Sequence, residues 1–315
     1  MVVEGSGASQ RSIKTKKAFA AVFRNWELYI MLLVVMAYFA IYHYAPMYGI
    51  QIAFRKFSGV KGITGSEWRG VFYFVRFFKS AYCFQLIKNT FILSVYQLSL
   101  SFPAQIILAL MMNELRSTWL KKTVQTVTYA PHFISMVVMC SMITLFLSPS
   151  TGVINKVIEK LGGSSVYFMG EPSYFKTIYV LSGVWQSTGW GSIIYMAALA
   201  GIDPQIHEAA IIDGASRMQR IWHVNIPGIL PTAVILLIMS CGNVMSVGFE
   251  KVYLLMNDTN RESAQIIATY VYETGLIDHD YSFSTAIGLF NSVINLVLLL
   301  LVNTIARKTS ENSLW

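Results

Sequence analysis

The stretch Glu208-Ala-Ala-Ile-Ile-Asp-Gly214, followed by Ile226 and Pro227, is a short polar segment between two long apolar runs. It combines an acidic side chain, two small residues and a glycine, which is the residue that most readily forms a turn. The small side chains let another polypeptide approach closely, and the acidic group can orient it. The pattern favours a surface onto which a separate subunit docks.

Composition places the chain in a membrane. Of its 315 residues, 55% are hydrophobic and only 13% are charged, against about 25% charged residues in soluble domains. The mean hydropathy is +0.52. A soluble domain of this length could not bury so much apolar surface. The net charge of +8 fits an anionic lipid surface, and its scattered distribution argues against nucleic-acid binding.

Six apolar runs predict six transmembrane helices. Each has about 20 residues or more, which is enough to cross a hydrocarbon core of about 30 Å. Because backbone groups in lipid must be satisfied internally, and no barrel-type alternation is present, the runs are expected to be α-helical. The runs are 28–48, 90–112, 126–147, 177–201, 230–249 and 284–306. We therefore expect an all-α, multi-pass membrane protein.

The total number of basic residues does not decide the topology, because with the N terminus inside 12 of the 24 Lys and Arg lie on each side, but their local clusters do indicate one. A basic N-terminal segment, the pair Lys121 and Lys122 in a tight loop, and Arg307 and Lys308 favour both termini in the cytoplasm. The expected segments are a cytoplasmic segment 1–27, a first transmembrane helix 28–48, an extracytoplasmic loop 49–89, a core 90–306 and a cytoplasmic tail 307–315. Within the loop, 68–78 alternates aromatic and basic residues, which predicts either an interfacial amphipathic helix or a loop packed on the bundle.

The loop 202–229 is predicted to contain two short helices. Asp203 can cap the first, and Gly214 can end it, because left-handed backbone is accessible to glycine. On this helix Glu208 is free to point outward, and Ala209 and Ala210 leave room for a partner.

The second helix of this loop has its own start signal. Ser216 and Gln219 have the spacing of a capping box. Pro227 and Pro231 are expected to end this helix and to restart the chain into the membrane, because proline lacks a backbone N–H and clashes with the preceding turn.

At this point the sequence resembles a known family. The spacing of Glu208, Ala209, Ala210, Gly214 and the later hydrophobic-Pro ending is similar to the EAA loop of bacterial ABC importer permeases of the MetI-like type. The ending consists of Val224, Ile226 and Pro227. At the positions of Val224 and Ile226 the family more often has Ile and Leu. Flanking segments 25–29, 45–49, 129–133 and 248–250 resemble the subgroup for oligosaccharides and polysaccharide fragments, such as alginate or rhamnogalacturonan.

The resemblance implies a MetI-like permease fold and a division of labour between subunits. The coupling residues would be Glu208, Ala209, Ala210, Asp213, Gly214 and Ala215. The loop 202–229, hereafter the coupling loop, would sit in a cleft of a cytoplasmic ATPase subunit. Two such ATPases would bind ATP and Mg, a second and distinct permease would complete the pore, and an extracytoplasmic solute-binding protein would deliver the oligosaccharide. The expected location is the bacterial plasma membrane.

The residues of the spans indicate that uncharged side chains contact the cargo and that the energy for transport comes from another subunit. No Asp, Glu, Lys or Arg lies within the six runs, which argues against an ion-driven carrier. Trp185, Gln186, Trp190 and Asn243 are the hypothetical substrate path, because hydroxyls need hydrogen-bond partners and sugar C–H faces stack on aromatic rings. The alternative for each is a contact between helices.

Catalytic and cofactor signatures are absent from the sequence. It contains no G-x-x-x-x-G-K-[ST] phosphate-binding motif and no zinc or nucleophile motif. We therefore expect a non-enzymatic transport subunit with no metal and no cofactor of its own. The alternatives are a permease of the same class for another solute, a stand-alone secondary carrier, and a membrane enzyme.

Overall fold

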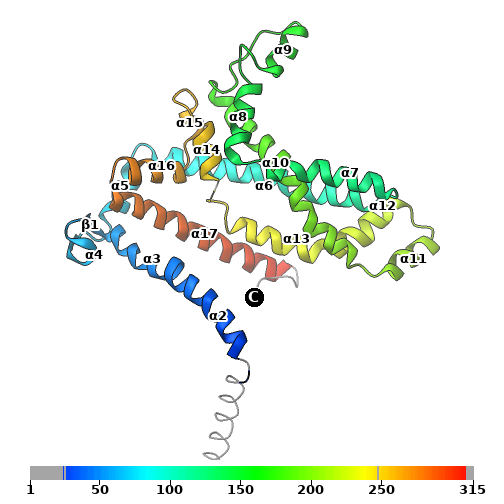
Figure 1. Ribbon diagram of the computed structural model, residues 1–315, viewed down its shortest axis with the longest axis horizontal. Coiled ribbons are helices and arrows are strands. Elements are labelled where there is room, and N and C mark those ends of the chain that lie inside the picture. The colour runs from blue at the N-terminus through cyan, green and yellow to red at the C-terminus, as the bar shows by residue number, and fades with distance from the viewer. Residues whose placement is uncertain (1–23, 25, 247, 310–315) are drawn as a thin grey trace, which may run out of the picture.

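A computed structural model describes residues 24, 26–246 and 248–309 of the chain as an almost entirely helical protein (Figure 1). The helices are α2 Trp26–Phe39, η1 Ala40–Tyr44, α3 Ala45–Met47, η2 Tyr48–Phe54, α4 Gly62–Gly65, α5 Phe72–Lys79, α6 Cys83–Asn113, α7 Thr118–Tyr129, η3 Ala130–Phe133, α8 Met136–Phe146, α9 Val153–Lys160, α10 Pro172–Ala200, α11 Pro204–Ile212, α12 Arg217–Arg220, η4 Ile221–Asn225, α13 Ile226–Cys241, α14 Phe249–Leu255, α15 Arg261–Ala264, α16 Ile267–Tyr272, η5 Glu273–Ile277 and α17 Tyr281–Thr309. Strands β1 (Arg55–Ser58) and β2 (Ser66–Trp68) pair antiparallel.

The first apolar run forms one helical rod, whose η2 end packs in the core cluster with α17 and whose α2 end projects away from the bundle (Figure 1). It extends over Trp26–Phe54, and no residue of its α2 part is buried. Because α2 is apolar all round and makes no core contacts, its natural solvent is lipid. The rod is longer than the expected run 28–48.

The small β-hairpin, α4 and α5 lie at the end of the bundle opposite α11 (Figure 1). The amphipathic segment expected at 68–78 forms α5, whose last turn carries Arg76 and Lys79. Its apolar face packs on α17, where Phe77 meets Phe283 and Phe290. The segment is therefore helical and also packed on the bundle.

Three hydrophobic clusters hold the bundle together, and α6 takes part in all of them. Leu93 belongs to the cluster with α8, α10 and α14. Leu86 belongs to the cluster with α5, α16 and α17. Ala109 and Leu110 belong to the cluster with α10 and α13. The long helix α6 is thus the central element against which the others are placed.

By length and composition, four helices of the described residues can cross a membrane, or five if the bent pair formed by α7–η3 and α8 is one span. The four are Trp26–Phe54, Cys83–Asn113, Arg217–Cys241 and Tyr281–Lys308. The fourth expected run, 177–201, lies in α10, which is long enough but is interrupted by a polar stretch from Ser182 to Ser192. Helix α6 begins at Cys83, ahead of the expected run 90–112.

The expected run 126–147 does not form one continuous helix. The chain bends by 99° between Thr118–Phe133 and Met136–Phe146. Pro131 begins a 3-10 turn, and Ser135 caps α8 by accepting a hydrogen bond from the Val138 N–H. Proline and a new N-cap within five residues start a second helix in a new direction.

The expected end of the fifth span and the role of its prolines are also wrong. The helix formed by α12, η4 and α13 runs without interruption over Arg217–Cys241, so Pro227 and Pro231 do not end it. The π-turn η4, in which the Ile226 N–H bonds to Ile221, widens the helix just before Pro227 and accommodates its ring. The helix then ends at Cys241 rather than at 249.

Helices α7 and α10 are in close contact at Gly189, which gives a first testable prediction. A Cβ atom at Gly189 would overlap the backbone carbonyl of Thr128. We expect Gly189→Ala to push the helices apart and to destabilise the folded protein by about 1 to 3 kcal/mol. Thermal unfolding of the detergent-purified protein measures this. Gly288→Ala is the matched control, because a Cβ there meets nothing within 4 Å; equal melting temperatures for both variants would refute the contact.

Candidate functional site

The coupling loop has the local structure that its sequence predicts. Asp203 accepts a hydrogen bond of 2.9 Å from the Gln205 N–H and begins α11. Ser216 and Gln219 form the expected capping box at the start of α12. Between the helices Gly214 adopts a φ of 77°, in the left-handed region that glycine enters without strain. Both predicted caps and the predicted turn are confirmed.

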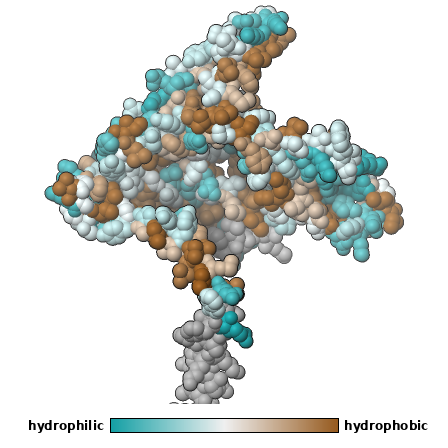
Figure 2. Space-filling view, in the orientation of Figure 1, coloured by the Kyte–Doolittle hydropathy of each residue, from teal (hydrophilic) through white to brown (hydrophobic). Residues whose placement is uncertain are grey.

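The loop presents an unpaired acid next to apolar side chains. Glu208 and Ala209 are exposed and Ala210 is half-buried, while Asp213 ends α11. Ile212 is 85% exposed, so an apolar tip occupies an otherwise hydrophilic end of the molecule (Figure 2). None of the ion pairs among the described residues involves Glu208. An exposed charge beside exposed isoleucine is suited to a protein partner.

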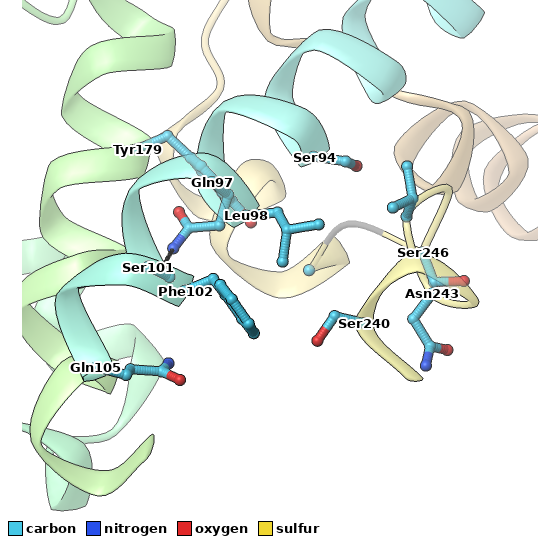
Figure 3. Close-up of a pocket in the computed structure, with 12 residues that line it drawn as sticks. Ser94, Gln97, Leu98, Ser101, Phe102, Gln105, Tyr179, Ser240, Asn243 and Ser246 are labelled. Atoms are coloured by element: carbon cyan, nitrogen blue, oxygen red, sulfur yellow. Dashed lines mark hydrogen bonds between the residues drawn. The ribbon is translucent and has the colours of Figure 1, made fainter. Parts of the chain in front are cut away.

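A cavity of about 320 Å³ lies between α6, α10 and the end of α13. One face of α6 contributes half of the lining residues, and Figure 3 shows its side chains opposite Ser240. The lining residues are Ser94, Gln97, Leu98, Ser101, Phe102, Gln105, Tyr179, Ser240, Asn243, Val244, Ser246 and Gly248. Hydroxyl and amide groups beside aromatic rings are able to bind a sugar.

The cavity wall includes a break between α13 and α14. Beyond Cys241 the chain turns, and α17 holds the turn from the other side. Asn295 accepts a hydrogen bond from the Met245 N–H at 2.9 Å, and Asn291 donates to the Met245 carbonyl at 3.1 Å. Irregular backbone at membrane depth is tolerated where it lines a cavity and its polar groups are satisfied. The break therefore marks this cavity as a functional candidate.

The four residues of the hypothetical path do not come together. Asn243 lines the cavity. Gln186 donates to the Ile134 carbonyl at the bend before α8, and Trp190 stacks on His132 with ring centroids 4.5 Å apart. Trp185 is 51% exposed and is not among the cavity-lining residues. Gln186 and Trp190 thus make the contacts between segments that were the alternative for them.

Sequence reasoning did not select the polar stripe on α6. Gln97, Ser101 and Gln105 follow one another at four-residue spacing, so they lie on one face of a helix. A polar stripe of this period in an apolar run is the signal that could have found the cavity wall. Tyr179 had no comparable signal, because its contribution depends on how α10 crosses α6.

A second group of polar residues lies where α6 and α10 begin. Lys88 and Lys176 line a depression there together with Glu262. Burial, and secondly the nearby positive charge of Lys88, lowers the pKa of Lys176. Neither lysine forms an ion pair with a described residue. With two lysines and one glutamate, this depression has an excess of positive charge.

Among the described residues, no group of three or more His, Cys, Asp or Glu side chains is placed to hold a metal ion. Cys83 and Cys140 are buried free thiols, and Cys241 is a partly buried one.

Residues 105–311 match the family model described as binding-protein-dependent transport system inner membrane component. Two relatives from Bacillus subtilis (strain 168) cover nearly the whole chain. The polygalacturonan/rhamnogalacturonan transport system permease protein YteP is 41% identical over 302 residues, which are 96% of this chain and 94% of that protein. Protein LplB is 42% identical over 296 residues, 94% of this chain and 93% of that protein.

Solved structures share the fold. A chain from the crystal structure of a bacterial ABC transporter involved in the import of the acidic polysaccharide alginate superposes with a TM-score of 0.87 at 40% identity, covering 93% of this chain and 99% of that one. A second crystal structure shows a bacterial alginate ABC transporter in complex with an alginate pentasaccharide-bound periplasmic protein. It gives the same TM-score and identity, covering 94% of this chain and 99% of that one.

Proposed function

Because this chain belongs to the family of binding-protein-dependent transport system inner membrane components, we propose that it is a membrane-spanning subunit of an ATP-driven bacterial importer of acidic polysaccharide fragments. Two kinds of observation support the cargo. Relatives that cover nearly the whole chain are named for polygalacturonan/rhamnogalacturonan transport and for alginate import. The observation that carries the proposal is the cavity between α6, α10 and α13, whose wall is rich in neutral hydrogen-bonding groups.

Energy enters from outside this chain. The sequence has no phosphate-binding motif, so separate ATPase subunits hydrolyse ATP with Mg and dock on the coupling loop. Glu208 and the exposed tip at Ile212 form the docking surface. Glu208 meets a basic group of the ATPase, and Ala209 and Ala210 permit close approach.

One continuous helix links the docking surface to the cavity. The helix Arg217–Cys241 begins just after Gly214, contains the cavity residue Ser240 and ends two residues before the cavity residue Asn243. Its 25 residues span roughly 37 Å. Movement of the coupling loop by the ATPases therefore displaces the cavity wall directly, and biases the bundle between two states open to opposite sides.

The same geometry fits the remaining partners. The coupling loop and the β-hairpin lie at opposite ends of the molecule (Figure 1), which supports cytoplasmic termini and an extracytoplasmic hairpin in a bacterial plasma membrane. A second, distinct permease completes the pore, and a solute-binding protein delivers the oligosaccharide at the hairpin end. The lysine pair Lys88 and Lys176 gives that end a charge that attracts an acidic chain.

Reconstitution tests the proposal. The membrane complex, expressed with its own ATPases and solute-binding protein, is expected to retain the ATPases after detergent extraction. In proteoliposomes it is expected to take up a labelled trigalacturonate only when ATP is present. Uptake that persists without ATP or ATPases would identify a secondary carrier instead, and ATP-driven uptake of other solutes but of no uronic oligosaccharide would refute the cargo.

A further inference from the structure

Lys251, in α14, is a buried cation without an acidic partner. Only 4% of its surface is exposed. Its Nζ donates a hydrogen bond of 2.6 Å to the Tyr179 carbonyl and lies 4.4 Å from the centroid of the Tyr179 ring. None of the ion pairs among the described residues includes it. Burying an ammonium group away from water is unfavourable unless other groups compensate for the lost hydration, and one carbonyl and one ring face compensate only in part.

The ammonium group lies directly behind the cavity wall. Tyr179, its partner, and Gly248, three residues before it, both line the cavity. A Cβ atom built on Gly183 would lie 3.1 Å from Lys251 Nζ and 2.7 Å from Gln97 Oε1. The cation and the amide of the cavity residue Gln97 therefore flank the same point on α10. In surroundings with little water, a charge this close to the cavity wall acts strongly on a ligand bound in the cavity.

Gln97 supplies a second unsatisfied group at this point. Its Nε2 donates to Ser101 Oγ at 2.5 Å. Its Oε1 is buried and has no hydrogen-bond partner among the described residues. A buried amide oxygen without a partner is rare in folded proteins. Because Gln97 lines the cavity but this oxygen is itself shielded from the surface, the side chain has to turn before the oxygen accepts a hydrogen bond from a hydroxyl there.

We propose that Lys251 and Gln97 form a subsite for one uronic acid residue, in which the Lys251 charge selects the carboxylate and Gln97 Oε1 accepts a hydrogen bond from a ring hydroxyl. This assignment rests on the function proposed above and adds the residues that choose an acidic sugar over a neutral one. The ammonium group of Lys251 and the carboxylate of the cargo have opposite charges, so each offsets the cost of burying the other.

A competing role for Lys251 is purely structural, namely to hold α14 against α10 through the Tyr179 carbonyl. Lys251→Met separates the two roles, because methionine keeps the apolar stem in place and removes the charge. A structural role affects all cargo equally. A selective role affects only the charged one, and Lys251→Arg, which keeps the charge, restores part of the selectivity.

The experiment compares trigalacturonate with its methyl ester, which has the same rings but no charge. Equilibrium binding of each to the detergent-purified complete transporter, without solute-binding protein, is measured by calorimetry. We expect Lys251→Met to weaken binding of the acid by about tenfold or more and to leave binding of the ester within about twofold of wild type. Lys156→Met, on the exposed face of α9, is the control and should change neither.

The outcomes are distinguishable. Equal weakening for acid and ester would assign Lys251 a structural role, and unchanged binding of the acid would show that its charge does not reach the cargo; either result overturns the subsite while the transport function stands. If wild type binds neither oligosaccharide and transports neither in proteoliposomes, the proposed function fails and the subsite fails with it.

Discussion

The Glu208→Lys variant is expected to insert and fold normally but to lose the ATP hydrolysis that the loaded solute-binding protein stimulates in the assembled transporter. Glu208 is exposed on α11 and has no ion pair among the described residues, so the change leaves the fold of this subunit intact. At the proposed docking surface it would place a lysine against the basic group of the ATPase. Truncating one partner of a buried interfacial charge pair costs about 2 to 5 kcal/mol, which corresponds to a loss of coupling of at least about 30-fold.

Rates of ATP hydrolysis in proteoliposomes, with and without loaded binding protein, measure this effect. Glu159→Lys is the matched control, because Glu159 is also an exposed helical glutamate but lies on α9, away from the coupling loop. Wild-type stimulation in Glu208→Lys would rule out the coupling role. Loss of stimulation in both variants would show that any added positive charge is harmful.

The Gly214→Val variant is expected to transport at least about tenfold less than wild type while remaining stable and correctly inserted. A Cβ atom at Gly214 meets nothing within 4 Å, so no neighbour is displaced. The effect comes from the backbone, since a φ of 77° costs an L-residue about 1 to 2 kcal/mol and a β-branched residue more. The turn between α11 and α12 then relaxes and tilts the docking surface.

Two further variants isolate the backbone effect. Gly59→Val is the control, because a Cβ there also meets nothing within 4 Å, yet its φ lies outside the positive region; it should transport normally. Gly214→Asn should retain intermediate transport, since asparagine tolerates the left-handed conformation. Normal uptake by Gly214→Val, measured with labelled oligosaccharide in proteoliposomes, would contradict the need for this turn.

Helix starts in the coupling loop could be predicted because the interactions that form them are local. The Asp203 cap and the Ser216 capping box join atoms two or three residues apart, and short-range hydrogen bonds of this kind depend little on the rest of the chain. Pro227 shows the limit of such reasoning. A proline usually ends a helix, but the preceding π-turn kept this one continuous.

The sequence alone determined that the chain is a helical membrane protein with an exposed acidic loop, because hydrophobic run length and local capping depend on neighbouring residues. Only the tertiary structure decided where the fifth span breaks and what faces the cavity. Asn295 meets Met245 across 50 residues, and Lys251 meets Tyr179 across 72. Contacts at such separations exist only once the helices have packed, so no local pattern specifies them.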